Sequence, residues 1–173
     1  MTRTIARRFN DRFSCKRPVF PEPQPLLSKA PVILGLDGSQ KMSKSRNNAI
    51  MLSATEEETR SLIKKAKTDS VRKITYDPET RPEVASLLLL CSLATGESPE
   101  SIAESISEGG SAKLKERLSD SLNAYLKPHR ERRKQLENDI GYVKSILRKG
   151  IKEARSVGAK TLEEVRMAMN MVI

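Results

Sequence analysis

A leucine stands at every fourth position over one stretch of this chain, and this spacing constrains the fold more than any other feature. The leucines are Leu114, Leu118, Leu122 and Leu126. Because residues four apart lie on one face of an α-helix, the spacing predicts an amphipathic helix with an apolar stripe. Aromatic residues make up only 3% of the chain and Trp is absent. The core must therefore be aliphatic, which favours helices packed on helices.

Capping and helix-breaking residues predict where the neighbouring helices begin and end. Ser53 and Glu56 have the spacing of a capping box, which predicts a helix from Ser53 to about Lys67. Pro82 is predicted to open an apolar helix that ends at Gly96. This helix should be buried, because it is apolar nearly all round.

The rest of the chain is also predicted to be helical, in several pieces. A short helix is expected over residues 98–108, and Pro128 should kink or divide the leucine-striped helix near its end. Gly158 is predicted to end the following helix, and Thr161 to cap a last one. The following helix has its own apolar stripe, formed by Leu136, Ile140, Val143, Ile146 and Leu147.

The first 52 residues have a different pattern. Residues 5–13 are predicted to form the end of a basic helix, whereas five prolines within 18–31 keep that segment out of a helix. Residues 32–36 are apolar and partly β-branched, which predicts a short buried strand. Residues 38–48 are rich in Gly, Ser, Lys and Asn, and we expect a loop there.

Cysteine, histidine and hydropathy limit the class of protein. Cys15 and Cys91 lie far apart and His129 is the only histidine, so no metal-ligand spacing or disulfide framework is present. We expect two reduced thiols, with Cys91 in the core. No apolar stretch is long enough to span a membrane and no signal-peptide core is found, so we expect a soluble, cytoplasmic protein with no metal site.

The segment with the clearest chemistry is Lys41-Met42-Ser43-Lys44-Ser45, which we call the lysine loop. Its two ammonium groups can neutralise the charge of a polyphosphate, and its hydroxyl and backbone N–H groups can donate hydrogen bonds to phosphate oxygens. The pattern therefore indicates a nucleotide phosphate site. A short basic loop is also compatible with a merely solvated surface.

The lysine loop resembles the second signature of the class I aminoacyl-tRNA synthetases, and its surroundings resemble the tryptophanyl-tRNA synthetases in particular. The resemblance covers essentially the whole chain. The matching segments are Gly35–Ser45, Ile5–Asn10, Phe20–Pro23, Thr68–Ser70, Tyr76–Glu79, Arg81–Val84, Pro128–Arg133 and Gly150–Arg155.

The resemblance implies a mostly α fold in two parts. Residues 1–52 would be a small remnant of the α/β, Rossmann-like nucleotide-binding domain, and residues 53–173 an all-helical domain that faces tRNA on the anticodon side. The implied activity is that of a tryptophan–tRNA ligase, which activates L-tryptophan with ATP to the adenylate and then transfers it to its tRNA. Mg²⁺ would travel on the ATP phosphates.

The resemblance also assigns residues. Lys41 and Lys44 would be catalytic and would contact the pyrophosphate in the transition state. The implied ATP-binding residues are Val32, through its backbone beside the adenine, together with Lys41, Met42, Ser43, Lys44 and Ser45.

Some family features are missing from these residues. The first class I signature, His-Ile-Gly-His or a variant, is absent, because the only histidine is His129. The segment that helps to hold tryptophan would precede Thr4 and is also absent. The chain departs from the family at Ser86, where Asn is usual, and at residues 111–113. We therefore expect no tryptophan activation by this chain alone, and L-tryptophan binding only with the missing half; full-length members are homodimeric.

The net charge of +10 is concentrated in the helical region. Residues 113–160 hold fourteen Lys or Arg against six acids, a net charge of +8. This surplus suits a polyanion such as nucleic acid, a nucleotide phosphate or an acidic membrane face, although a basic, inert surface is the alternative. The resemblance implies that the polyanion is tRNA(Trp). The predicted tRNA-binding residues are Arg130, Arg132, Arg133 and Lys134, with further cations at Lys144, Arg148, Lys149, Lys152 and Arg155.

Two functions from different classes fit the sequence. One is a part of the ligase. The other is a non-catalytic, stand-alone tRNA-binding module derived from the ligase. Both predict tRNA binding, and they differ in whether Lys41 and Lys44 still meet ATP. Another nucleotidyl-transferase of the same superfamily is disfavoured, because the resemblance extends from Thr68 to Arg155.

Overall fold

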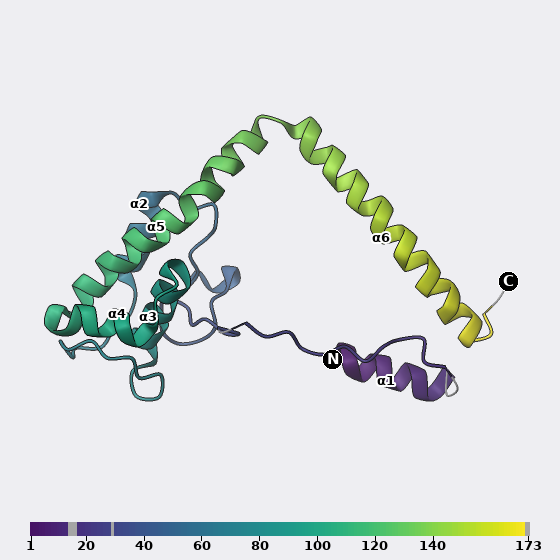
Figure 1. The fold of residues 1–173 in the computed structure, drawn as a ribbon, viewed down its shortest axis with the longest axis horizontal. Helices are drawn as coiled ribbons and strands as arrows, with labels where there is room; N and C mark the ends of the chain where they lie inside the picture. The colour runs from purple at the N-terminus through teal and green to yellow at the C-terminus, as the bar shows by residue number, and fades with distance from the viewer. Residues whose placement is uncertain (14–16, 29, 172–173) are drawn as a thin grey trace. The chain divides into compact units, whose positions relative to one another are not determined.

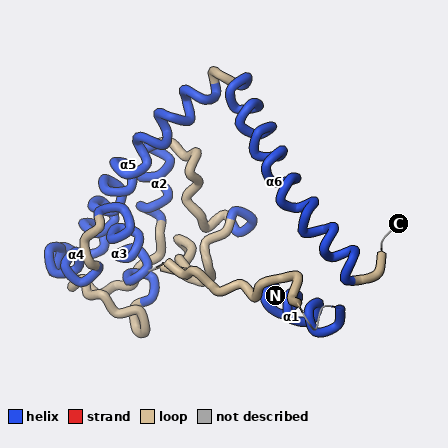
Figure 2. The backbone as a smooth tube through the Cα atoms, turned by 45° about the vertical axis from the view of Figure 1, so that its right-hand side comes forward, coloured by secondary structure: helices blue, strands red, loops and turns tan. Residues whose placement is uncertain are grey.

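The leucine-striped segment forms the longest element of the core. In the computed structural model, which describes residues 1–13, 17–28 and 30–171, it lies in helix α5 (Gly110–Glu137). Leu114 and Leu118 are fully buried and Leu126 is nearly so, which confirms the predicted stripe. Figures 1 and 2 show helices α2, α3 and α4 gathered beside α5. Their bounds are Glu56–Lys65, Pro82–Thr95 and Pro99–Ile106, and a 3-10 turn, η2 (Ser107–Gly109), leads into α5.

Helix α3 is buried, as its composition predicts. Pro82 occupies its first turn, and Gly96 ends it with a left-handed φ of 81°, a conformation that glycine adopts without strain. Leu88 and Cys91 on this helix are fully buried, and burial raises the pKa of the Cys91 thiol. Cys15 lies outside the described residues.

The cap of helix α2 lies two residues later than predicted. The capping box is made by Thr55 and Glu58, not by Ser53 and Glu56: the Glu58 N–H donates to the Thr55 hydroxyl and the Thr55 N–H donates to the Glu58 carboxylate. The spacing is the same in both pairs, so the sequence alone did not separate them. At the other end the ammonium of Lys115 donates to the carbonyls of Lys64 and Ala66, which satisfies acceptors that the helix leaves unpaired.

Pro128 does not divide its helix, and the predicted helix end at Gly158 does not occur. Helix α5 continues through Pro128, and a single helix α6 (Ile140–Ala168) runs through both Gly158 and Thr161. Glycine in a helix costs only about 1 kcal/mol relative to alanine, so it does not end a long helix by itself. The Thr161 hydroxyl donates to the Val157 carbonyl within the helix and caps nothing.

The break falls instead at Asn138 and Asp139. The Asp139 carboxylate accepts from the Tyr142 N–H and so caps α6. No residue of α6 is buried within the part of the chain that the structure describes.

The predicted strand over residues 32–36 is also wrong. Figure 2 shows no strand in the described ranges, and the segment makes one isolated antiparallel bridge, between Leu34 and Lys41. The architecture is thus mostly helical, and the Rossmann-like remnant stays a prediction.

Contacts between Cα atoms group residues 28–134 into one compact unit and residues 1–27 with 135–173 into another. The first unit joins the lysine loop to the helices that follow it. The predicted domain boundary between residues 52 and 53 stays a prediction. None of the described helices is both long enough and apolar enough to cross a membrane.

Helix α1 (Thr2–Phe13) confirms the predicted basic helix, and the proline-rich segment folds against it. The Asn10 amide accepts from the N–H groups of Val19 and Phe20 and donates to the Phe20 carbonyl. Arg7 makes a bidentate ion pair with Glu22. These contacts give residues 17–24 a fixed place without secondary structure.

Candidate active-site loop

The lysine loop begins on a short hairpin-like stem, and we use the word stem for residues 33–36, which pair with residues 40–42. The Gly35 N–H donates to the Gln40 carbonyl at 2.7 Å, and the Met42 N–H donates to the Ile33 carbonyl at 2.8 Å. The chain reverses over residues 37–40, where Gly38 has a φ of 70° that favours glycine. The sequence placed all of residues 38–48 in one loop, whereas the structure pairs residues 40–42 with the stem.

Both lysines of the loop reach solvent. Lys41 and Lys44 are exposed, and neither is in an ion pair with a described residue. Lys44 begins the 3-10 helix η1 (Lys44–Arg46), which adds Arg46 as a third exposed cation. Arg46 was not among the residues predicted from the sequence, although its place beside the signature could have suggested it.

The hydroxyls of the loop lie close together. The Oγ atoms of Ser43 and Ser45 are 3.0 Å apart, within hydrogen-bond distance. Met42 between the two lysines is half-buried. The loop thus offers cations and hydroxyl donors with no carboxylate paired to its lysines, an arrangement that suits an anion with several oxygens.

A buried asparagine lies under the loop. The Asn48 side chain is 3% exposed. Its carbonyl oxygen accepts from the Ser43 N–H at 2.8 Å, and its amide donates to the Asp37 carboxylate at 3.1 Å. Hydrogen bonds from Ser39 and Asn48 lower the pKa of Asp37. Asn48 was not predicted from the sequence, because a single Asn in a polar segment carries no periodic signal.

The stem is joined to the helices of its own unit. The Lys67 N–H donates to the Leu36 carbonyl at 2.8 Å, and the Leu36 N–H donates to the Asn48 carbonyl. Gly38 packs on Glu83 of α3 so tightly that a Cβ there would lie 2.3 Å from the Glu83 Cγ. Glu83 is also paired with Lys67 at 2.9 Å, which lowers the pKa of the Glu83 carboxyl. These contacts hold the stem of the lysine loop against the helices of its own unit.

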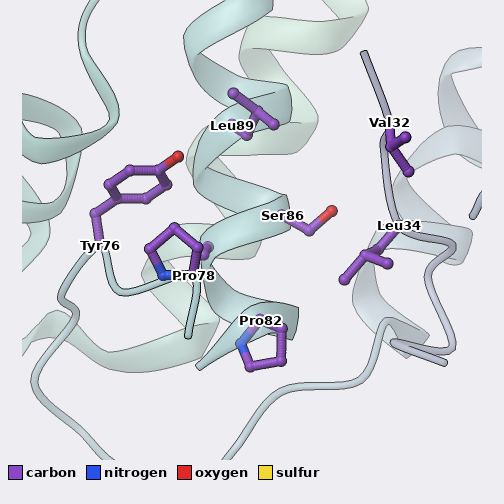
Figure 3. Close-up of a pocket in the computed structure, with 8 residues that line it drawn as sticks. Val32, Leu34, Tyr76, Pro78, Pro82, Ser86 and Leu89 are labelled. Carbon is purple, nitrogen blue, oxygen red and sulfur yellow. The ribbon is translucent and has the colours of Figure 1, made fainter. Parts of the chain in front are cut away.

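The candidate adenine contact, Val32, lines a pocket beside this stem. The pocket has a volume of about 150 Å³. Figure 3 shows the Ser86 hydroxyl pointing from α3 toward the Val32–Leu34 segment. This hydroxyl is buried and has no hydrogen-bond partner among the described residues. The remaining lining residues are Leu34, Tyr76, Pro78, Pro82, Ala85 and Leu89.

The structure divides the four candidate tRNA-binding residues. The Arg130 guanidinium is directed inward, where it donates to the Ala54 carbonyl, the Thr59 hydroxyl and the Asn123 side chain. It therefore joins α5 to the start of α2. The other three residues, Arg132, Arg133 and Lys134, are exposed. On α6 the exposed cations are Lys144, Arg148, Lys149, Lys152 and Arg155.

Comparison with known proteins gives the family. A family model described as "tRNA synthetases class I (W and Y)" matches residues 1–127. The tryptophan–tRNA ligase of Gloeobacter violaceus is 38% identical over 177 residues, which cover 99% of this chain and 52% of the relative. That of Thermotoga maritima is 37% identical over 182 residues, with coverages of 99% and 52%. The chain spans about half the length of these relatives.

Solved structures agree. The tryptophanyl-tRNA synthetase of Mycoplasma pneumoniae matches with a TM-score of 0.72 at 25% identity, over 96% of this chain and 52% of the other. The enzyme of Campylobacter jejuni, complexed with ADP and tryptophan, matches with a TM-score of 0.65 at 25% identity, over 97% and 52%. By sequence and by fold, the chain belongs to the tryptophanyl-tRNA synthetases of the class I family.

Proposed function

We propose that this chain is the carboxy-terminal part of a tryptophan–tRNA ligase and carries its polyphosphate-binding loop and its tRNA-facing helices. The reaction would be the activation of L-tryptophan by ATP, followed by transfer to tRNA(Trp). The observation that carries the proposal is the pair of exposed lysines, Lys41 and Lys44, free of ion pairs with the described residues and standing on an anchored stem.

The proposed chemistry is electrostatic. Negative charge accumulates on the pyrophosphate as it leaves the α-phosphate, and Lys41 and Lys44 would neutralise it there. The hydroxyls of Ser43 and Ser45 would donate to phosphate oxygens, with Met42 seating the loop. The backbone of Val32 would contact the adenine. Mg²⁺ would arrive with ATP and be held mainly by its phosphates.

The isolated chain should not complete this reaction. Its single histidine, His129, lies on α5 and supplies no His-x-Gly-His signature to orient ATP. A lysine loop accelerates the reaction only if the substrate is held within reach. We expect no tryptophan-dependent pyrophosphate exchange by residues 1–173 alone.

The test is a calorimetric titration of the chain with tripolyphosphate, which has the same phosphate chain as ATP without the base. We expect Lys41→Ala/Lys44→Ala to weaken binding at least about ten-fold, because each charge-assisted contact contributes about 1.5–3 kcal/mol. Lys65→Ala/Lys73→Ala is the matched control, since it removes the same charge from exposed sites elsewhere in the same unit.

Equal weakening in both variants would mean that only net charge matters, and it would contradict the proposal. Binding of tRNA without binding of tripolyphosphate would favour the alternative function, a tRNA-binding module that has lost the ATP site. That outcome would leave the role of the helices intact while removing that of Lys41 and Lys44.

A further inference from the structure

The lysine loop is fixed at its first half and held only locally at its second half. Lys41 and Met42 pair with the stem through the Leu34 bridge and the Ile33 carbonyl. Among the described residues, the backbone hydrogen bonds of residues 44–47 are those of the 3-10 turn: the Arg46 N–H donates to the Ser43 carbonyl and the Asn47 N–H to the Lys44 carbonyl. Ser43 therefore lies where the fixed part meets the turn that carries Lys44.

The Asn48 side chain holds this junction. Its oxygen accepts the Ser43 N–H at 2.8 Å, and its nitrogen donates to Asp37 at 3.1 Å. The side chain is 97% inaccessible to solvent, so water does not compete easily for either bond. One amide thus ties the middle of the lysine loop to the turn at the end of the stem.

Only a side chain with one donor and one acceptor makes both contacts. An ionised Asp has no donor, an aliphatic residue has neither group, and Ser is too short to replace both amide atoms. Gly35 provides the space: a Cβ there would lie 2.0 Å from the Asn48 nitrogen and 2.3 Å from its Cγ. Gly35 has no positive φ, so this space, and not backbone conformation, is what requires glycine.

We propose that Asn48 is a positioning residue that holds Ser43, and through it the spacing of Lys41 and Lys44, in the geometry that receives a polyphosphate. The inference rests on the proposed function of the lysine loop. Asn48 itself is buried beneath the loop, so we expect it to act without contacting the phosphate. Loss of the Asn48 side chain would leave both lysine side chains present but would no longer hold them at a fixed distance from each other.

Amide hydrogen exchange tests the structural part of this inference. We expect Asn48→Ala to lower the protection factor of the Ser43 N–H at least about ten-fold, the factor that corresponds to one lost hydrogen bond. Asn47→Gly is the matched control, because Asn47 is exposed and its left-handed φ of 53° suits glycine. Unchanged protection at Ser43 in Asn48→Ala would overturn the inference.

Two further variants disturb the contacts of the residue 48 side chain in other ways. Gly35→Ala keeps the Asn48 amide but displaces it, so it should reproduce the loss of protection at Ser43. Asn48→Asp lacks the donor when ionised and regains it when protonated. At neutral pH the new carboxylate would face the Asp37 carboxylate with no donor between them, so repulsion should displace it and lower the protection of the Ser43 N–H. Protection should recover as the pH falls, and the wild type is measured over the same range because Asp37 titrates in both proteins. Failure of both effects would contradict the assignment.

Tripolyphosphate affinity then tests positioning itself. Asn48→Ala should weaken tripolyphosphate binding several-fold at a temperature where both proteins are fully folded, which a role in overall stability alone would not produce. If Asn48→Ala does not fold, Asn48→Ser takes its place. Unchanged affinity with lost protection would overturn the positioning role. If the wild-type chain does not bind tripolyphosphate, the proposed function fails, whereas the exchange experiment still decides whether Asn48 holds the loop.

Discussion

At the scale of single residues, the structure shows what two of the segments that matched the family do physically. Asp69 and Arg81 lie in two such segments, and the structure joins them in a bidentate pair with distances of 2.7 and 2.8 Å. Arg81 also donates to the carbonyls of Lys73 and Val71 and to the Thr75 hydroxyl. One guanidinium thus organises a loop that has no secondary structure. Sequence alone gave the spacing of these residues but not their contact.

The Asp69–Arg81 pair should contribute to stability and make it depend on pH. Arg81 lowers the pKa of Asp69, so the carboxylate stabilises the fold above its unfolded pKa of about 3.9 and loses this effect as the pH falls through the lower folded pKa. We expect Asp69→Asn to reduce the free energy of unfolding by about 2 kcal/mol at pH 7.

Urea unfolding of both proteins from pH 7 to pH 2.5 measures this effect. Other carboxylates with lowered pKa, among them Asp77 and Glu83, titrate in both proteins, so the difference between the two curves isolates Asp69. The gap should narrow toward acid. A gap that is constant with pH would show that the Asp69 charge does not matter.

At the scale of elements, apolar periodicity predicted the helices well, whereas proline and glycine predicted helix ends only in part: Pro82 and Gly96 bound α3 as expected. The stripe of α5 and the apolar surface of α3 were predicted because burial repeats along a helix. Pro128 was predicted to kink or divide its helix and Gly158 to end one, yet both lie inside continuous helices. The predicted strand does not form, because residues 32–36 make one isolated bridge and have no neighbouring strand among the described residues.

The start of α2 offers a test of which capping box forms. Thr55→Ala should lower the free energy of unfolding by about 1 kcal/mol, since it removes the acceptor of the Glu58 N–H. Ser53→Ala is the control, because Ser53 is exposed and lies outside the helix. Thermal unfolding by circular dichroism compares the two. A larger loss in Ser53→Ala than in Thr55→Ala would contradict the observed cap.

At the scale of the whole molecule, the net charge of +10 is the feature that favours binding of nucleic acid. The sequence predicted a basic group at 130–134, but it could not separate Arg130, which binds its own unit, from its exposed neighbours. Helical periodicity does not show which cation of a group turns inward, because that depends on the carbonyls that α2 presents. We propose Arg132, Arg133 and Lys134 as the tRNA-contacting residues of this segment.

Salt dependence of tRNA binding tests this surface. Replacing Arg132, Arg133 and Lys134 by Ala, with Arg130 retained for stability, should reduce the slope of log affinity against log salt by about 2 to 3, since each phosphate contact contributes about 0.9. Lys65, Lys73 and Lys113 are exposed residues whose replacement gives a control of equal charge. The same change of slope in both variants would indicate a general charge effect and no defined surface.

The proposal that the lysine loop receives a polyphosphate is tested by mapping where ATP acts on the chain. Backbone amide shifts of ¹⁵N-labelled 1–173 would be followed as Mg·ATP is added. We expect the largest shifts at residues 41–46 and at Asn48, and their loss in Lys41→Ala/Lys44→Ala. Shifts spread evenly over the basic residues of α5 and α6, with none concentrated at the lysine loop, would contradict the account.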